Sequence, residues 1–321
     1  MIPVLFEIGP VTVYSYGAML AIGFLLGAWF LRVELRRWGY NEDISDHVVI
    51  GAMVGGVAGA KLYFVFIEAP GRMVQDPWGT LFSGAGLTYY GGLIGAVAVV
   101  LLIARWHKVP MLKLLDMTGP LAVLGYGWGR VGCFLSGDGD YGPPSNLGHD
   151  GIYNPPMAWI GPHQVAVPND IPWSVAFPDG TVPTTLPVHP TPVYEFLTIW
   201  AAFLVLWFFV RKLQTGRGFM IGISFVVMGV ERFITEFWRL ESSVLVSYGY
   251  NVALGTTQRE LDAFSAAVQA HYSGWLGLST AQWISVWTLL AGIALILWSR
   301  RMPPEIPPAA DSQQSANKAK A

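Results

Sequence analysis

The chain has 321 residues, of which 53% are hydrophobic and only 12% are charged, and its mean hydropathy is +0.45. A soluble domain carries about 25% charged residues, so this composition predicts that a bilayer rather than water surrounds the fold. The formal net charge of −2 leaves no basic surface for nucleic acid. A single cysteine excludes an intramolecular disulfide and a multi-thiolate zinc centre, and we expect neither a metal nor a cofactor.

Seven apolar runs are long enough to cross a bilayer, whose core of roughly 30 Å needs about 20 helical residues. In chain order they are Val11–Leu31, Val48–Ile67, Leu87–Ala104, Leu114–Phe134, Val193–Val210, Phe219–Trp238 and Ala281–Trp298. We expect the first run to stay as a helix and not to be cleaved as a signal peptide, because no Lys or Arg precedes it. The sequence therefore predicts an all-α integral membrane protein with seven transmembrane helices.

The basic residues gather on one side of this predicted bundle. The connections after the first, third and fifth runs and the C-terminal segment hold 13 of the 19 lysines and arginines, namely Arg32, Arg36, Arg37, Arg105, Lys108, Lys113, Arg211, Lys212, Arg217, Arg300, Arg301, Lys318 and Lys320. The 80 residues from Val131 to Val210 hold none. Because basic loops stay in the cytoplasm, we predict that the N-terminus is outside and the C-terminus cytoplasmic. Residues 1–301 then form a single transmembrane domain, and the Pro-rich residues 302–321 form a disordered cytoplasmic tail.

Two long connections are predicted on the outer side. The first, about 135–192, is rich in Pro, Gly, Asn and Asp and contains a strand-like piece at Trp173–Phe177, so we expect an ordered arm. The second, about 240–280, has apolar positions at helical spacing within Thr256–His271. We expect it to lie on the membrane surface or to cap the bundle.

Three arginines lie inside or next to predicted spans, where charge is costly. A charge at the bilayer centre costs at least about 2.5 kcal/mol, so such residues are functional candidates by default. Arg232, Glu236 and Arg239 share one helix face, which also fits a self-neutralising structural ion pair. Arg130 has no carboxylate three or four residues away. Its guanidinium therefore needs an anion elsewhere in the fold or in a ligand such as a lipid phosphate.

Two further motifs stand at the outer ends of predicted spans. Four glycines within Gly132–Gly142 would let backbone N–H groups approach a ligand, and the acids Asp138 and Asp140 are candidates for a base or for orienting other residues, although a plain helix exit is the other interpretation. The aspartates of this segment are too few for a calcium site. Before the fifth span, His189 places an imidazole at the interface and Glu195 a carboxylate one turn inside. A lone interfacial histidine is usually structural, so its functional interpretation needs support.

Together these motifs resemble those of the prolipoprotein diacylglyceryl transferase family, over most of the chain and in the same order. The matching motifs are Tyr16-Gly17, Gly91-Gly92-Leu93-Ile94-Gly95, Asp116, Gly129-Arg130-Val131-Gly132, Phe134 with Gly137, His189-Pro190, Tyr194-Glu195, Arg232-Phe233-Ile234, Glu236-Phe237 and Arg239. The resemblance implies a multi-pass enzyme of the bacterial cytoplasmic (inner) membrane. Its implied reaction transfers the diacylglyceryl group of phosphatidylglycerol to the thiol of a lipobox cysteine in a prolipoprotein and releases glycerol phosphate.

The resemblance also implies site residues and partners. Arg130 and Arg232 match the two arginines expected to hold the phospholipid phosphate. The other positions that it assigns to substrate binding are Tyr16, Gly91, Gly92, Gly137, Tyr194, Glu195, Glu236 and Arg239. The implied partners are phosphatidylglycerol, a prolipoprotein lipobox peptide and membrane lipids, with no nucleic acid.

Departures from the family pattern fall on the thiol side of the implied reaction. The family typically has His directly before the Gly-Gly pair, where this chain has Tyr90, and its Gly-Asn-Phe-x-Asn-Gly-Glu motif becomes Gly-Cys-Phe-Leu-Ser-Gly-Asp at 132–138. A phenol with an ordinary pKa of about 10 is a poor base unless nearby guanidinium groups lower that pKa. The candidates for accepting the thiol proton are therefore Tyr90, Asp138 and His189.

Two alternatives stand beside the transferase hypothesis. A paralogue that uses the same lipid donor with a different acceptor would account for Tyr90 and for the two exchanged asparagines. A non-catalytic protein that binds or transports anionic lipid would use the same intramembrane arginines. The Gly-rich helix exit, the His-Pro motif and the two arginines occur together, and this combination favours an enzyme.

Overall fold

Seven long helices dominate the part of the chain that the computed structural model describes, namely residues 2–9, 11–82, 88–142, 157–160, 163–166, 172–213, 215–236, 239 and 278–308. They are α1 (Ser15–Arg37), α2 (Ile44–Tyr63), α5 (Tyr89–Trp106), α6 (Met111–Ser136), α7 (Thr191–Phe208), α8 (Phe219–Thr235) and α11 (Thr280–Ser299). One helix falls in each predicted apolar run. A π-helical turn, Phe64–Glu68, follows α2 and leads to the short helices α3 (Pro70–Gln75) and α4 (Pro77–Phe82).

Among the described residues, four helical segments are long and apolar enough to cross a membrane. They are Ser15–Arg37, Ile44–Glu68, Thr191–Lys212 and Thr280–Ser299. The apolar part of α5 is shorter, while α6 and α8 carry charged side chains in their sequences. The mostly helical fold is thus confirmed, whereas seven crossings and their orientation stay predictions.

Short antiparallel hairpins correct the all-α prediction. The first pairs β1 (Val4–Ile8) with β2 (Val11–Tyr14), so the prediction that the first helix begins at Val11 is wrong. Valines alternate with a threonine there, as in a strand, and α1 starts only at Ser15. The other hairpins lie in the predicted arm and pair β3 (Met157–Ile160) with β4 (His163–Ala166) and β5 (Val175–Phe177) with β6 (Thr184–Val188). The predicted helix at Thr256–His271 lies outside the described residues.

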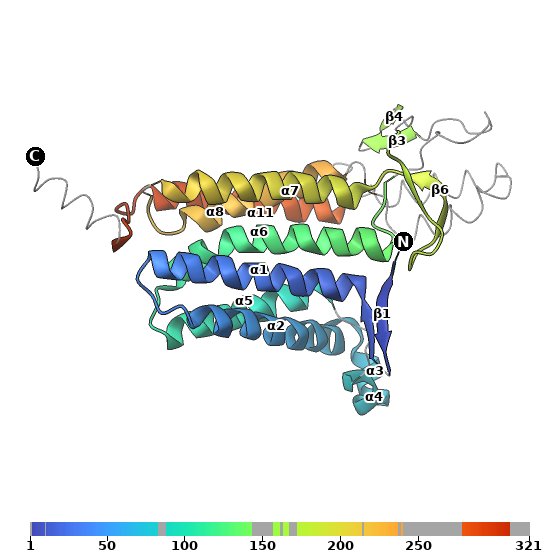
Figure 1. Cartoon of the computed structure of the whole chain (residues 1–321), viewed down its shortest axis with the longest axis horizontal. Helices are drawn as coiled ribbons and strands as arrows, with labels where there is room; N and C mark the ends of the chain where they lie inside the picture. The colour runs from blue at the N-terminus through green and yellow to red at the C-terminus, as the bar shows by residue number, and fades with distance from the viewer. Residues whose placement is uncertain are drawn as a thin grey trace, which may run out of the picture.

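The long helices lie side by side, and α6 runs through the middle of the bundle (Figure 1). Helix α6 packs against α1, α7 and α8, while α2 packs against α5 and α8 against α11. The hairpin β1–β2 and the strands of the arm lie at the end of the bundle where α1 begins and α6 ends (Figure 1). This end therefore collects the C-terminal turn of α6, the first turn of α7 and the last turn of α8.

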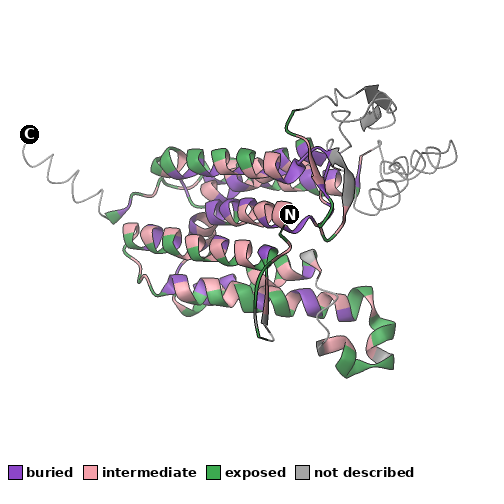
Figure 2. Cartoon of the chain, turned by 45° about the vertical axis from the view of Figure 1, so that its right-hand side comes forward, coloured by how far each residue is buried: buried purple, intermediate pink, exposed green. Residues whose placement is uncertain are grey.

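Burial divides each helix into an inner and an outer side (Figure 2). The core gathers buried side chains from α1, α6 and α7, among them Leu35, Leu124 and Phe203. The outer sides expose large apolar residues, and Leu25 is 70% exposed. Contiguous apolar surface of this kind is stable only in apolar surroundings. The fold is therefore that of a membrane protein.

Ion pairs hold the opposite end of the bundle together. Glu34, which is buried in α1, accepts a hydrogen bond of 2.9 Å from Arg211 after α7. Glu305 lies in the predicted tail and pairs with Lys113 of α6 at 2.7 Å and with Arg217 before α8. These contacts neutralise several of the basic residues that predicted the cytoplasmic side. Residues 309–321 of the tail lie outside the described part.

Glycines let α2 and α5 approach closely. A Cβ added at Gly59 would lie 2.4 Å from the carbonyl oxygen of Gly91, and one added at Gly95 would lie 2.2 Å from the carbonyl oxygen of Gly55. Both distances are too short for any side chain. Small residues spaced by four positions are a common way for membrane helices to pack with their backbones in contact.

We predict that Gly59→Ala lowers the free energy of unfolding of the purified protein by about 1–3 kcal/mol, and with it the melting temperature, because the new methyl group forces α2 and α5 apart. Gly56→Ala is the matched control, since a Cβ there has its nearest neighbour, the Gly92 carbonyl oxygen, at 3.7 Å. Equal melting temperatures for the two variants would show that the close approach is not needed.

Candidate functional site

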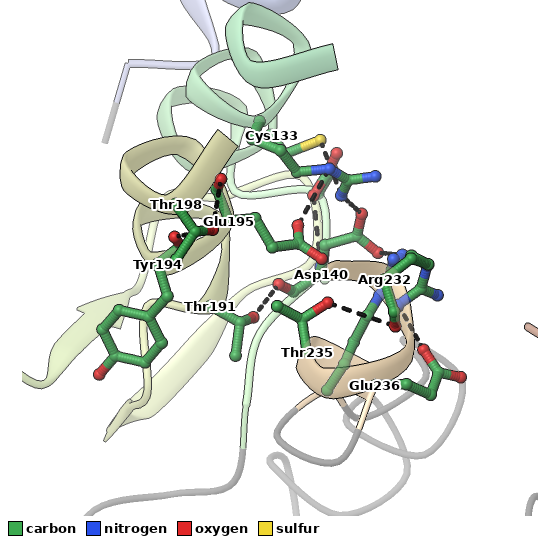
Figure 3. A network of polar contacts seen from close by, with 12 residues as sticks. Cys133, Asp140, Thr191, Tyr194, Glu195, Thr198, Arg232, Thr235 and Glu236 are labelled. Carbon is green, nitrogen blue, oxygen red and sulfur yellow. Dashed lines mark hydrogen bonds and ion pairs between the residues drawn. The ribbon is translucent and has the colours of Figure 1, made fainter. Parts of the chain in front are cut away.

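Charged side chains from three helices meet at the end of the bundle that carries the hairpins (Figure 3). Arg130 comes from α6, Glu195 from α7 and Arg232 from α8. Glu236 and Arg239 follow α8, and Asp140 follows α6. We call these six residues the arginine cluster, because each of its three guanidinium groups forms an ion pair with at least one of its three carboxylates.

Arg130 is the centre of the arginine cluster. Its Nε lies 3.0 Å from Glu195 Oε2, and its Nη1 donates to Asp140 Oδ2. The guanidinium also lies 4.9 Å from the centre of the Tyr126 ring, one turn deeper on α6. The anion that Arg130 needs is therefore supplied by two other elements of the fold. Glu195 is only 1% exposed, so this pair is sheltered from water.

Asp140 joins two arginines from different parts of the chain. One carboxylate oxygen accepts from Arg130 and the other from Arg239. Burial alone would raise the pKa of Asp140, but the charges of Arg239 and Arg130 lower it below its ordinary value. Both acids of the Gly-rich segment were candidates in the sequence, with Asp138 as the proton acceptor, but the pairing of Asp140 with two arginines was not predicted.

A left-handed turn explains why Asp140 and not Asp138 reaches the arginines. Gly137 ends α6 with φ +62°, and Gly139 has φ +96°, a conformation that favours glycine. Asp138 then turns back on the loop, where its Oδ1 accepts from the Asp140 backbone N–H at 3.3 Å. Thr191 at the start of α7 donates to the Asp140 carbonyl at 2.6 Å and fixes the main chain.

Arg232 is held by the i, i+4 pair with Glu236 that the sequence predicts, and a third residue that the sequence analysis did not name extends this pair. Glu236 lies four residues on, and its Oε2 pairs with Arg232 Nη1. The other oxygen of Glu236 accepts a hydrogen bond of 2.8 Å from the Ser279 hydroxyl. Ser279 is the N-cap of α11 and forms a capping box with Gln282. The Ser-x-x-Gln pattern before the last apolar run was the signal for this cap.

His189 forms a second polar group beside the arginine cluster. Its Nδ1 lies 3.4 Å from the Tyr194 hydroxyl, which accepts from Trp173 Nε1 at 2.7 Å. Its carbonyl accepts from the Gly142 backbone N–H at 2.9 Å, which connects it to the segment that carries Asp140. Burial lowers the pKa of His189, because it disfavours the charged imidazolium.

Tyr16 and Cys133 lie where α1 meets the end of α6. A Cβ on Gly132 would be 2.9 Å from the Tyr16 ring, so glycine is needed for this approach. Cys133 is buried and accepts a contact of 3.6 Å from Arg130. Cys133, Asp138 and Asp140 place possible ligand atoms within 4.8 Å of one another. Both oxygens of Asp140 are already paired with arginines, which argues against a metal ion there.

Tyr90, Gly91 and Gly92 stand apart from these ion pairs at the start of α5. Helix α5 packs mainly against α2, and Tyr90 is 45% exposed. A Cβ at Gly91 would lie 2.5 Å from the Gly59 carbonyl oxygen. The structure therefore gives Gly91 a role in helix packing. A role in substrate binding stays a prediction for Gly91 and Gly92, as does the role of Tyr90 as a proton acceptor.

The fold and the arginine cluster define a membrane protein with a group of paired arginines and carboxylates at one end of its helix bundle. Residues 3–298 match the family model for prolipoprotein diacylglyceryl transferase, and the chain belongs to this family. Proteins named phosphatidylglycerol–prolipoprotein diacylglyceryl transferase are similar to it. The one from Clostridium tetani is 29% identical over 295 residues, covering 91% of this chain and 96% of that protein.

Two other relatives with the same name agree in coverage. The protein of Chromohalobacter salexigens is 32% identical over 305 residues, covering 94% of this chain and 93% of the relative. The protein of Cupriavidus pinatubonensis is 27% identical over 309 residues, covering 93% of this chain and 91% of the relative. The family resemblance of the sequence motifs is thus confirmed, and the chain is a transferase.

We predict that Ser279→Gly lowers transferase activity about tenfold, which is the effect of losing one hydrogen bond to a charged group, while Ser279→Thr keeps it. Glycine still caps a helix at a cost of a few tenths of a kcal/mol, so melting temperatures should stay close to wild type. Full activity of Ser279→Gly would show that the Ser279 hydroxyl does not position Glu236.

Proposed function

We propose that this chain transfers the diacylglyceryl group of phosphatidylglycerol to the thiol of a lipobox cysteine in a prolipoprotein and releases glycerol phosphate. The observation that carries this proposal is the convergence of Arg130, Arg232 and Arg239 at one end of an apolar bundle. Guanidinium groups bind phosphate oxygens through paired hydrogen bonds. Membership of the transferase family and the names of the relatives support the donor and the acceptor.

The arginine cluster suits the departure of a phosphate group. In the proposed reaction the acceptor sulfur forms a bond to the terminal glycerol carbon of the diacylglyceryl group. The carbon–oxygen bond to phosphate breaks, and its electron pair leaves with glycerol phosphate. Arg130 and Arg232 would stabilise the negative charge that develops on this oxygen. Preorganised charges of this kind stabilise a transition state most strongly in a site that excludes water.

His189 is the proton acceptor that we favour for the thiol. Burial lowers its pKa and so favours the neutral imidazole, and its buried Nε2 has no hydrogen-bond partner among the described residues. The Asp138 carboxylate instead accepts a hydrogen bond from the Asp140 backbone N–H. Tyr90 lies on the α2–α5 side of the bundle. The thiol proton would thus move to Nε2 as the carbon–sulfur bond forms.

An apolar hollow next to His189 suits the acceptor peptide. It has a volume of about 350 Å³ and lies between β5 and α7, lined by Phe134, Trp173, Val175, Pro190, Val193, Tyr194 and Leu197. Tyr194 belongs both to this lining and to the hydrogen bond with His189. A prolipoprotein segment whose apolar residues fill the hollow would therefore bring its cysteine to the imidazole.

The proposed location is the bacterial cytoplasmic membrane, with the arginine cluster in the outer half. The described residues place the hairpins and the cluster at one end of the bundle and the paired basic residues at the other. Basic residues favour the cytoplasmic side. The seven long helices would then each cross the membrane, and phosphatidylglycerol would come from the outer leaflet.

We predict that Arg130→Ala lowers the transfer of radiolabelled diacylglyceryl to a lipobox peptide by about 10²–10³-fold, the usual effect of removing one group that stabilises developing charge. Arg36→Ala is the matched control, because Arg36 pairs with Glu42 on the exposed surface at the other end of α1. Transfer that survives in Arg130→Ala would contradict the proposal.

The alternatives give different results in the same assay. A peptide in which serine replaces the lipobox cysteine should accept no label from the wild-type protein. Label on that peptide would favour a paralogue with another acceptor, which the exchange of the family His for Tyr90 suggests. Saturable binding of phosphatidylglycerol without any product would favour a lipid-binding protein.

A further inference from the structure

Asp140 occupies the guanidinium groups that a donor phosphate would need. Its two carboxylate oxygens accept from Arg130 of α6 and from Arg239 beyond α8. A carboxylate and a phosphodiester are chemically alike here, since each carries one negative charge and presents two oxygens to planar guanidinium groups. The resting site therefore already holds an anion that belongs to the chain.

Arg130 and Arg239 cannot easily serve both anions together. Asp140 is ionised, because the two guanidinium groups lower its pKa, so a phosphate beside it would be repelled. A buried carboxylate or phosphate without a guanidinium partner is costly, so the two anions compete for the same guanidinium groups. Entry of a phosphate is thus favourable only if the carboxylate of Asp140 gives up its place.

Asp140 is the most exposed carboxylate of the arginine cluster and has the shortest side chain. Its side chain is 20% exposed, whereas Glu195 and Glu236 are 1% and 2% exposed and sit on or at the end of a helix. Its main chain is anchored by Thr191 and by the Asp138 carboxylate. Rotation of one short side chain therefore suffices for the exchange, without movement of a helix.

We propose that Asp140 neutralises the arginines between turnovers and that the donor phosphate binds by replacing its carboxylate on Arg130 and Arg239. Asp140 is then the residue that sets the affinity for the donor lipid. The same exchange in reverse helps to expel glycerol phosphate after transfer. This inference rests on the proposed function, because it takes the arginines as the phosphate site.

The test compares Asp140→Asn with the wild-type protein in detergent micelles. Asparagine keeps the shape but not the charge, so the dissociation constant for phosphatidylglycerol and the inhibition constant for glycerol phosphate should both fall about tenfold or more. Turnover at saturating donor should fall or stay equal, because the product leaves more slowly. A residue with a merely structural role would weaken binding when changed, which is the opposite direction.

Asp138→Asn is the matched control for charge. Its carboxylate lies in the same loop, with an oxygen within 4.8 Å of one on Asp140, but it bonds a backbone N–H and not an arginine. In Asp138→Asn, the dissociation constant for phosphatidylglycerol and the inhibition constant for glycerol phosphate should each change less than threefold. An equal gain in affinity for both variants would overturn the exchange, because it would show only a general effect of negative charge.

A second readout covers the case in which Asp140→Asn is unstable. Ligands stabilise the folded state in proportion to their affinity, so glycerol phosphate should raise the melting temperature of this variant more than that of the wild type. Equal or weaker stabilisation would overturn the inference. A wild-type protein that transfers no diacylglyceryl group would instead contradict the proposed function, so the two failures are distinguishable.

Discussion

The need to neutralise the Arg130 guanidinium inside an apolar bundle organises this structure. An unpaired buried charge costs several kcal/mol, and α6 itself offers no carboxylate one turn away from Arg130. Glu195 of α7 and Asp140 beyond α6 supply the missing charge. The ends of α6 and α7 must therefore meet, and the loop after α6 must fold back over Arg130.

The same requirement connects the later helices to this end of the bundle. Arg239 shares the carboxylate of Asp140, so the residues after α8 are drawn to α6. Arg232 forms an ion pair with Glu236, and Glu236 accepts a hydrogen bond from Ser279, the N-cap residue of α11. The contacts form two groups, which are Glu195–Arg130–Asp140–Arg239 and Arg232–Glu236–Ser279. The backbone N–H of Arg239 joins them by donating to the Glu236 carbonyl oxygen. The three guanidinium groups and the three carboxylates balance in formal charge, and in our proposal Arg130 and Arg239 become available to the donor phosphate when Asp140 leaves them.

The sequence predicted the helices better than their contacts. Hydropathy located all seven long helices, because an apolar run of this length has few alternatives in a bilayer. It misplaced the start of α1, since Val11–Tyr14 is as apolar as the helix that follows and only its pairing with Val4–Ile8 makes it a strand. Three of the predicted binding positions, Arg232, Glu236 and Arg239, have i, i+3 and i, i+4 spacing that already placed them on one face.

The partners of the arginines could not be predicted from the sequence. Which carboxylate meets Arg130 depends on how α6 and α7 pack and on the left-handed glycines that aim Asp140 and turn Asp138 away. Ser279 is 43 residues from Glu236, so only tertiary structure brings them together. Gly91 matched a family motif, but its place against Gly59 shows a packing role that a motif alone does not reveal.

The most direct measurement is a structure of the wild-type protein determined with phosphatidylglycerol bound. We predict that the lipid phosphate lies on the Arg130 and Arg239 guanidinium groups within hydrogen-bond distance, with Arg232 beside it and the Asp140 carboxylate rotated away. A phosphate bound elsewhere on the bundle, with the contacts of Asp140 to both arginines intact, would contradict it.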